Sequence, residues 1–355
     1  MVFRKKKSVE VAQTDSAENA ISNREVEGLS QRQIVIRRFV RHRAAMISLS
    51  ILTLLIIFVF SASTFKVGPF GWRGWWKWGI DDLPELSICQ GGTVGCPTLS
   101  LVPGHNFGLG KHPFGQDDIG HDYFALVMRG AQRSLMVTFI IGLVSGVIGT
   151  VVGAIAGFYR GVTDNVLMRF VDFLITIPSI IIGSVIGYHF GNLGAAFLAL
   201  YLGLFTWTGL SRLVRGEFLT LRERDFVDAA RVAGASNRRI IFKHILPNAV
   251  GVIIVSVTLL MSGAILLETA LSYLGFGVVP PDVSLGLLIS QYQDSFVTRP
   301  WLFWWPGLLI ITIALSINFI GDGLRDAFDP RQRRRITRKD RERAKDSLSN
   351  QGQAK

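Results

Sequence analysis

The sequence predicts an all-α, polytopic membrane protein with about six transmembrane helices. Of its 355 residues, 49% are hydrophobic and only 18% are charged, whereas a water-soluble domain carries about a quarter charged residues. The apolar residues form long runs, which indicates lipid as the solvent. Lysine and arginine are concentrated between alternate runs, which indicates one orientation across a bilayer.

Six runs are long enough to cross a hydrocarbon core about 30 Å thick, which needs roughly 20 helical residues. They lie at residues 44–66, 134–158, 165–190, 193–211, 248–272 and 302–323. The fourth run is the weakest, because Gly203 and Gly209 interrupt it. The first run follows a long charged segment, so we interpret it as an uncleaved anchor and not as a signal peptide.

The distribution of basic residues predicts that both termini are cytoplasmic. With the N-terminus inside, 31 of the 38 lysines and arginines lie on the inner side and 7 on the outer side. Cytoplasmic loops of membrane proteins carry such an excess, and tryptophan marks the headgroup region. Tryptophan clusters after the first span and at the start of the sixth, at Trp72, Trp75, Trp76, Trp78, Trp301, Trp304 and Trp305.

The segments that flank the spans are polar or basic. Residues 1–28 are predicted to be a disordered cytoplasmic tail, and residues 331–355 a basic cytoplasmic tail. Apolar side chains interleave with five arginines from Leu29 to Arg43, which predicts an interfacial helix that leads into the first span, together residues 29–66. The net charge of +12 raises nucleic acid as a partner. Because the basic residues lie in blocks between apolar runs, we predict no nucleic-acid binding.

The predicted extracytoplasmic loop spans residues 67–133 and holds the only two cysteines, Cys89 and Cys96. They are predicted to form a short disulfide if the loop faces an oxidising exterior, and two free thiols are the alternative. Side chains further along the loop offer ligand chemistry for a metal ion, namely His112, Asp117, Asp118, His121 and Asp122. We favour turn and helix-capping roles for these residues and predict no metal site.

Two spans carry glycine at helical spacing. The second has GxxxG pairs at 142/146, 149/153 and 153/157, and the third has Gly183, Gly187 and Gly191. Rows of residues without side chains let another helix approach backbone to backbone. The pattern therefore predicts a tightly packed bundle.

Charged and helix-breaking residues within the spans are candidates for a transport pathway. A charge at mid-bilayer costs about 2.5–3.5 kcal/mol on insertion scales, so each one needs a reason. Asp172 follows Arg169 by one turn, and an ion pair between them near the cytoplasmic boundary is our favoured interpretation. Pro178 is expected to bend the third span. Glu268 precedes a Gly/Pro-rich stretch, where it either binds a cationic group of a substrate or supports the adjacent turn.

The cytoplasmic loop at about 217–247, here called the coupling loop, is longer than a simple connection requires. It predicts a short helix from Asp225, a break at 234–236, and a second helix to Leu246, after which Pro247 opens the fifth span. Small residues on the first helix and arginines around the tip predict docking into a groove of a cytoplasmic partner. These residues are Ala229, Ala230, Ala233, Arg231, Arg238 and Arg239.

The segment DAARVAGASNRRIIFKHILPN resembles the EAA loop of ABC-importer permeases, whose pattern is EAA, three residues, glycine and then leucine–proline. Asp228 replaces the glutamate, and His244 stands where isoleucine is frequent. HPFGQDDIGHD, ETALSYLGFGVVPPDVSLG and GDGLRDAFDPR resemble stretches of the dipeptide/oligopeptide/nickel branch of that family. The similarity extends from about Leu29 to Arg331. The part of the outer loop at roughly 70–100 has no counterpart that we assign.

The resemblance implies a type I ABC-importer permease architecture, with a permease core at 134–330 and cytoplasmic coupling helices that sit in a cleft of an ATPase subunit. It places coupling at Asp228, Ala229, Ala230 and Gly234, beside which we include Ala235 and Arg238. It also implies a second homologous permease, two ATPase subunits or domains, and an extracytoplasmic substrate-binding protein. The implied location is a bacterial inner membrane.

The sequence has no phosphate-binding loop of its own. The nearest approach, GHNFGLGKH at 104–112, has the wrong glycine spacing and lacks the hydroxyl residue. We therefore predict a transporter subunit that is not an enzyme and has no cofactor, with ATP and magnesium bound by its ATPase partners.

The predicted substrate is a di- or oligopeptide, with nickel or another small solute as the alternative. A membrane-embedded enzyme and a carrier that works alone are disfavoured. Asp172, His189 and Glu268 lie at different depths, and the coupling loop would have no role in either.

Overall fold

The structure is a computed structural model that describes residues 31–67, 70–88, 94–99 and 109–328. The expected tails, residues 1–28 and 331–355, and Cys89 lie outside the described residues. Backbone contacts divide the chain into two units, one of residues 40–324 and one of residues 1–39 with 325–355. The helix α2 (Gln31–Arg41) confirms that the chain is helical before the first span.

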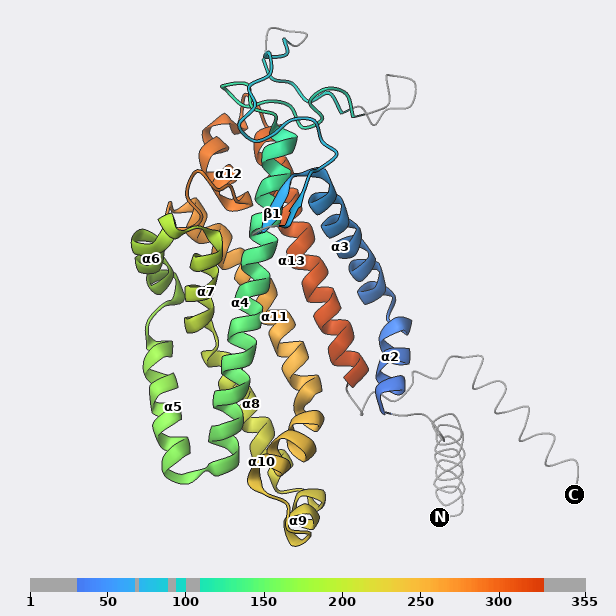
Figure 1. The fold of residues 1–355 in the computed structure, drawn as a ribbon, viewed down its shortest axis with the longest axis vertical. Coiled ribbons are helices and arrows are strands. Elements are labelled where there is room, and N and C mark those ends of the chain that lie inside the picture. Colours follow the sequence, from blue (N-terminus) through green and yellow to red (C-terminus); the bar gives the residue numbers. More distant parts are fainter. Residues whose placement is uncertain (1–30, 68–69, 89–93, 100–108, 329–355) are drawn as a thin grey trace, which may run out of the picture. The chain divides into compact units, whose positions relative to one another are not determined.

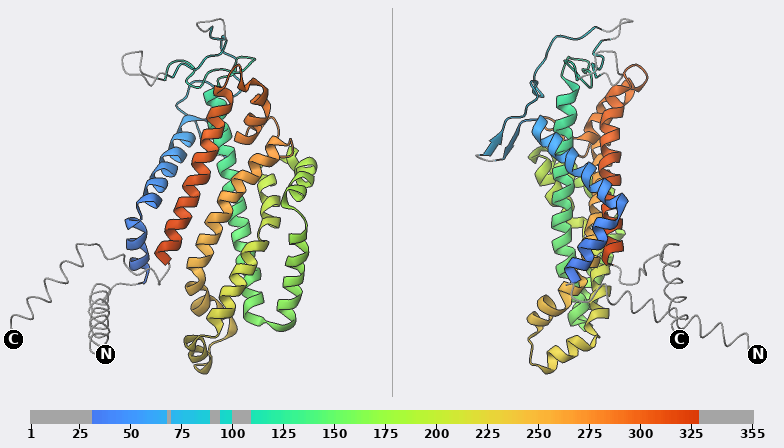
Figure 2. Two further views of the ribbon diagram at one scale, coloured as in Figure 1. Left: turned by 180° about the vertical axis from the view of Figure 1, so that it is seen from behind. Right: turned by 90° about the vertical axis from the view of Figure 1, so that its right-hand side faces the viewer.

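Four helical segments of the described residues are long and apolar enough to cross a membrane. They are α3 (Arg43–Ala62), α4 (Tyr123–Tyr159), the continuous segment Asn237–Tyr273, and α13 (Trp301–Phe328). The third of these consists of α10 (Asn237–Arg239), the π-helical turn η2 (Ile240–Ile245) and α11 (Leu246–Tyr273). Within residues 40–324 the long helices run side by side (Figures 1 and 2).

Two further helix pairs are bent spans. α5 (Gly161–Thr176) meets α6 (Ser179–Phe190) and its continuation η1 (Gly191–Leu193) at 78°, and α7 (Ala195–Thr206) meets α8 (Thr208–Arg222) at 44°. With each pair counted as one span, the described residues hold six, which confirms the predicted all-α membrane fold.

The break between α5 and α6 lies at the expected proline. Pro178 lacks a backbone N–H and disfavours helical geometry in the residue before it. Ile177 accordingly adopts extended dihedral angles, with φ −88° and ψ 120°. The bend expected at this position is confirmed.

The connections contain the remaining short elements. They are β1 (Phe65–Val67), β2 (Phe70–Trp72), α9 (Asp225–Val232), α12 (Leu285–Tyr292) and the 3-10 helix η3 (Gln293–Phe296). β1 and β2 form an antiparallel hairpin that the sequence did not predict.

Two helices extend beyond the expected spans. α4 begins at Tyr123, before the expected span at 134–158, because the buried side chain of Asp122 caps it by accepting the N–H of Ala125. α8 runs on to Arg222, well past residue 211, as a helix with one polar and one apolar face. The coupling loop therefore begins inside α8.

The glycine rows of α4 bring helices together at backbone distance, as predicted. A Cβ added at Gly153 would lie 2.5 Å from the carbonyl oxygen of Ser211, and one at Gly157 would lie 2.7 Å from that of Arg215. Both carbonyls belong to α8. The absence of side chains on this face of α4 is what allows α8 to pack so closely.

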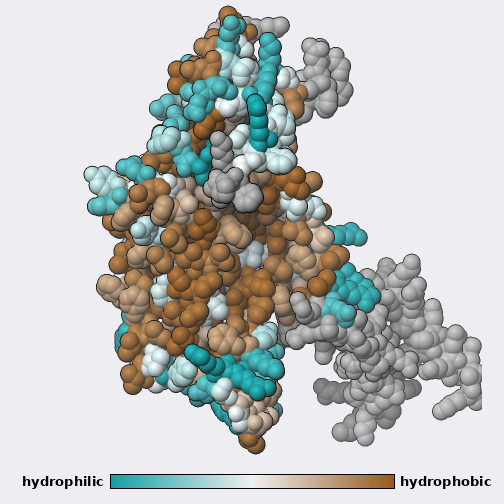
Figure 3. Space-filling model, viewed as in Figure 1, coloured by the Kyte–Doolittle hydropathy of each residue, from teal (hydrophilic) through white to brown (hydrophobic). Residues whose placement is uncertain are grey.

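The surface of residues 40–324 has the polarity that a lipid environment requires. In Figure 3, hydrophobic side chains form a broad band across the helices, and hydrophilic side chains gather at the two ends. We call the end that carries α9 the coupling end, and the end that carries residues 109–122 the loop end (Figure 1).

Candidate functional site

The first helix of the coupling loop, α9, packs one face against the rest of the chain. Val227 and Ala230 are buried, with exposed fractions of 0% and 8%, in an apolar cluster that includes Ile240 and Ile245 of η2. Asp225 lies in the first turn of α9, where a negative charge interacts favourably with the helix dipole. The other face of α9 is open.

The predicted break is confirmed as a glycine-terminated helix end. Gly234 has φ +77°, its N–H donates to the carbonyl of Arg231 (2.9 Å), and the N–H of Ala235 donates to that of Ala230 (3.0 Å). This pair of bonds is the Schellman motif, which requires a left-handed residue and favours glycine. The Ser236 hydroxyl then accepts the N–H of Arg239 at 3.4 Å, so the predicted cap is confirmed as well.

The second coupling helix is not separate from the fifth span, and in this respect the prediction was wrong. The chain is helical without interruption from Asn237 to Tyr273. Pro247 lies in the first turn of α11, as expected, but the wider π turn η2 precedes it. A proline ring would clash with the carbonyl four residues earlier in a regular helix, and the π turn relieves that conflict.

The six predicted coupling residues divide into two groups. Ala230 is buried, and Ala235 is half-buried against the apolar cluster of α9 and η2. The other four are exposed, namely Asp228, Ala229, Gly234 and Arg238. Asp228 also forms an ion pair with Arg231 (2.9 Å), and both side chains remain open to solvent.

Sequence reasoning missed three exposed apolar side chains on the coupling loop. Phe226, Val232 and Phe242 have exposed fractions of 39%, 91% and 66%. The available signal was that Phe226 and Val232 stand on either side of the alanine pair in the sequence. With the open alanine and glycine, they give the coupling end an uncovered apolar surface next to arginines.

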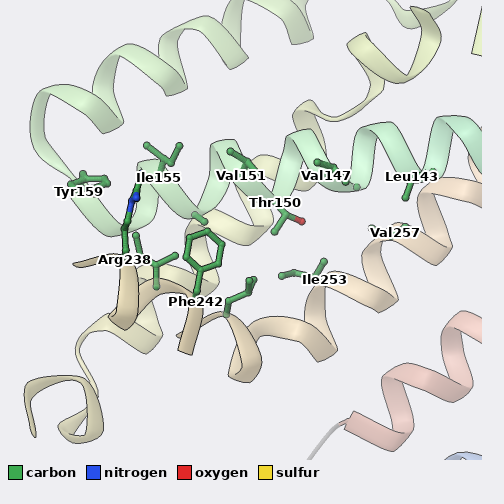
Figure 4. Close-up of a pocket in the computed structure, with 15 residues that line it drawn as sticks. Leu143, Val147, Thr150, Val151, Ile155, Tyr159, Arg238, Phe242, Ile253 and Val257 are labelled. Atoms are coloured by element: carbon green, nitrogen blue, oxygen red, sulfur yellow. The ribbon is translucent and has the colours of Figure 1, made fainter. Parts of the chain in front are cut away.

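A groove of about 590 Å³ lies between α4 and the segment formed by η2 and α11. Its walls are aliphatic and aromatic, with Leu143, Val147 and Val151 on α4 facing Phe242 and Ile253 (Figure 4). Arg238 extends toward Tyr159 at the end nearest the coupling loop (Figure 4). The groove therefore begins at a predicted coupling residue and follows α4 into the membrane-spanning part.

The ion pair predicted within the third span is wrong in its partner. Asp172 pairs with Arg212 of α8 and not with Arg169. A second pair joins the same two helices, since Arg215 binds the carboxylate of Asp164 with Nη2–Oδ2 at 2.6 Å. Both carboxylates thus connect α5 to α8, which carries the coupling loop.

Glu268 is fully buried, so it does not face an open pathway in this chain. Its two carboxylate oxygens accept hydrogen bonds from the hydroxyls of Ser134 (2.9 Å) and Ser272 (2.8 Å). The Ser272 oxygen in turn accepts the N–H of Val278 in the Gly/Pro-rich turn. Of the two interpretations offered, support of the adjacent turn is the one that these contacts favour.

The histidines and aspartates of the outer loop form two pairs. His112 Nδ1 lies 2.7 Å from Asp122 Oδ2, and His121 Nδ1 lies 2.7 Å from Asp117 Oδ2. Asp117 also accepts the backbone N–H groups of three residues in its turn. The predicted turn role is confirmed for Asp117 and the cap role for Asp122. In the described part of the chain, no group of three such side chains is placed to hold a metal ion.

Further contacts fix the loop end. Tyr292 donates to Asp117 (3.0 Å), and burial together with the Asp117 carboxylate raises the pKa of this phenol well above its usual value. Cys96 is disulfide-bonded, and its predicted partner Cys89 lies outside the described residues.

Two of the tryptophans expected at the lipid interface pack inside the loop end. Trp76 Nε1 donates to Asp122 (2.9 Å), and Trp78 stacks on the His112 ring with centroids 5.7 Å apart. Both are half-buried, whereas Trp72, Trp75 and Trp304 are exposed. The interfacial interpretation therefore fits only the exposed members.

Comparison with known proteins identifies the relatives of this chain. Residues 149–334 match the family described as binding-protein-dependent transport system inner membrane component, and residues 30–70 match the N-terminal TM domain of oligopeptide transport permease C. The oligopeptide transport system permease protein OppC of Mycobacterium tuberculosis (strain ATCC 25618 / H37Rv) is 39% identical over 308 residues, which cover 86% of this chain and 97% of that protein.

Two further matches are a second permease sequence and a solved structure. The OppC protein of Escherichia coli (strain K12) is 38% identical over 322 residues, which cover 90% of this chain and 98% of that protein. A solved structure of the MetNI methionine ABC transporter aligns with a TM-score of 0.49 at 21% identity, over 57% of this chain and 96% of that chain. Membership of a family rests on the sequence matches.

Proposed function

The chain belongs to the binding-protein-dependent transport system inner membrane component family, and from this membership we propose that it is a permease subunit of an ATP-driven importer of oligopeptides. It forms half of a translocation path and couples to a separate ATPase through residues 225–247. The substrate class follows the names of the relatives, which are oligopeptide permeases over nearly their whole length. Nickel or another small solute remains the alternative substrate.

The geometry of the coupling loop carries the proposal. Val227 and Ala230 are the buried residues of α9 among the described residues, so its opposite face and the turn at Gly234 are available to a partner. The continuous helix from Asn237 to Tyr273 joins that turn directly to a membrane span. A displacement of α9 by an ATPase would therefore be transmitted to the span without an intervening flexible linker.

The proposed assembly contains partners that supply what this chain lacks. Two ATPase subunits or domains bind ATP and magnesium, a homologous permease completes the path, and an extracytoplasmic binding protein delivers the substrate. No cofactor is proposed for this chain. The assembly lies in the inner membrane of a bacterium with both termini of this chain in the cytoplasm, which the excess of arginine and lysine on the coupling side supports.

Pro178 and Asp172 are proposed to belong to the moving part of the path. The helix break at Pro178 supports a hinge between α5 and α6. The Asp172–Arg212 pair supports a mechanical connection from the hinged helix to the coupling end. Glu268 is proposed to hold the turn after α11 in place, a positioning role and not substrate binding.

Replacement of Gly234 tests the proposal. Gly234→Val places a β-branched residue at φ +77°, whereas Gly234→Asn keeps a residue that tolerates this region. No atom lies within 4 Å of an added Cβ, so the two variants differ in backbone strain and not in a clash within the chain. We expect Val to abolish co-purification of the ATPase and peptide uptake, and Asn to retain most of both. Unchanged uptake and ATPase association with Val would contradict the docking role.

A further inference from the structure

Two arginines on α4, for which the proposed function has no role so far, lie one helical turn apart near the loop end. Arg129 and Arg133 occupy positions i and i+4, so their positive charges share one face and repel each other. A single carboxylate contacts both. Asp282 Oδ1 lies 2.8 Å from Arg133 Nη2 and 4.0 Å from Arg129 Nη2.

The two guanidinium groups have more hydrogen-bonding capacity than their neighbours satisfy. The Nε atoms of both arginines are buried and have no hydrogen-bond partner among the described residues. The further bonds of Arg129, to Gln132 Oε1 and the Thr64 carbonyl, are long at 3.3 and 3.4 Å. A guanidinium has five N–H donors in a fork that fits a carboxylate bidentately. With one carboxylate for two guanidinium groups, the cluster keeps a net positive charge.

The cluster is accessible and lies on the face of α4 that lines the groove farther along the helix. About a fifth of each side chain is exposed, namely 19% of Arg129, 22% of Arg133 and 23% of Asp282. Val147 and Val151 follow Arg129 and Arg133 by about five helical turns of 3.6 residues, so all four lie on one face of α4. That face becomes the wall of the groove farther along the helix.

From this arrangement we propose that Arg129 and Arg133 bind the free C-terminal carboxylate of a peptide substrate as it enters the α4 face from the loop end. The inference rests on the proposed peptide transport. Asp282 holds the guanidinium groups in the absence of substrate, and the incoming carboxylate competes with it. A short zwitterionic peptide complements the whole cluster, because its carboxylate meets two cations and its ammonium group has Asp282 nearby.

The test compares one peptide in two forms, with a free C-terminal carboxylate and with a C-terminal amide. The complete transporter is reconstituted in proteoliposomes with saturating binding protein, and the initial uptake rates of the two forms are expressed as a ratio. The binding protein is a separate and unchanged subunit, so a change of this ratio between permease variants belongs to the permease. We expect Arg129→Gln/Arg133→Gln to lower the acid-to-amide ratio by about tenfold, as loss of a charge-assisted hydrogen bond predicts.

Two further variants keep the test decisive. Asp282→Asn removes the competing carboxylate and is expected to raise the ratio. Arg129→Lys/Arg133→Lys keeps both charges but loses the bidentate fork, so an intermediate ratio is expected even if the glutamine variant fails to assemble. Arg73→Gln, which removes an exposed arginine of the loop end outside the cluster, is the control and should leave the ratio unchanged.

The outcomes separate this inference from the function on which it rests. Peptide uptake by the wild type with an unchanged ratio in the arginine variants overturns the carboxylate site alone. An assembled wild-type transporter that takes up neither form overturns peptide transport itself. A loss that affects acid and amide equally, and that follows the fraction of anionic lipid in the vesicles, assigns the arginines to lipid phosphate and overturns the carboxylate site.

Discussion

The loop end and the coupling end of residues 40–324 are stabilised by different kinds of interaction. At the loop end several polar pairs are buried, as for His112 with Asp122 and for Glu268 with its serines. At the coupling end most ion pairs are exposed, although Asp164, which binds Arg215, is buried. In the pair of Arg160 with Glu223, 42% and 62% of the side chains remain open to solvent.

The difference has a physical consequence for movement. Buried polar pairs that lose a partner leave an unsatisfied charge in a low dielectric, so they resist rearrangement. Exposed pairs are screened by water and salt and exchange at little cost. The coupling end also contains a π turn, whereas the loop end has an aromatic cluster in which Phe114 stacks on Trp305 with centroids 4.0 Å apart. We infer that one end of the permease deforms and the other serves as the fixed frame.

The largest effect is expected when a buried pair of the loop end is broken. Asp122→Ala removes the helix cap of α4, the acceptor for Trp76 and the partner of His112 in one step. Removing one member of a buried pair costs about 3–5 kcal/mol. Denaturant unfolding of the purified chain in detergent measures this loss.

A matched control for Asp122 lies in the same loop. Asp118 forms an ion pair with Arg299, but 57% of its side chain is exposed. Asp118→Ala should therefore cost less than about 1 kcal/mol. Equal losses for the two variants would show that burial does not distinguish the loop end, and the comparison would fail.

A smaller effect is expected when a side chain is added where α6 contacts the backbone of the turn after α11. A Cβ added at Gly187 would overlap the carbonyl oxygen of Phe276, which is backbone and cannot rotate away. Gly187→Ala should destabilise the chain by about 1–3 kcal/mol through overpacking. Gly263→Ala is the control, since no atom lies within 4 Å of its added Cβ, and alanine there should be neutral or stabilising. The same unfolding titration distinguishes the two, and a neutral Gly187→Ala would mean that the turn after α11 yields easily.

The sequence predicted most of the fold because the relevant signals are local. Hydrophobic run length locates the spans, proline marks the break at Pro178, and Gly234 with Ser236 marks the turn of the coupling loop. The cap ahead of Tyr123 was predicted, whereas the partners of Asp122 were not. Trp76 and His112, both from the preceding loop, complete its hydrogen bonds, and such contacts between distant positions leave no local signal.

The sequence predicted where the candidate site lies, but it did not predict which side chains form ion pairs. Composition indicates a docking loop and the resemblance to the EAA loop places its coupling residues, whereas the partner of Asp172 depends on how α5 packs against α8. Arg169 was the neighbour in sequence, and Arg212 is the neighbour in space. The arginines of α4 gave no signal in the sequence for the same reason, since Asp282 is far away in the chain.

The smallest effect is expected for the pair of Asp172 with Arg212. Both side chains are 48% exposed in this chain, so a double-mutant cycle of Asp172→Asn and Arg212→Gln should give a coupling energy below about 1 kcal/mol in detergent. The same double-mutant cycle in the complete transporter then shows whether water, lipid or the second permease surrounds the pair. A coupling energy that stays small places it in contact with water, as a deformable connection between α5 and α8 requires. A coupling energy of several kcal/mol would place it under lipid or the second permease, and the contrast between a fixed and a deformable end would no longer hold at this position.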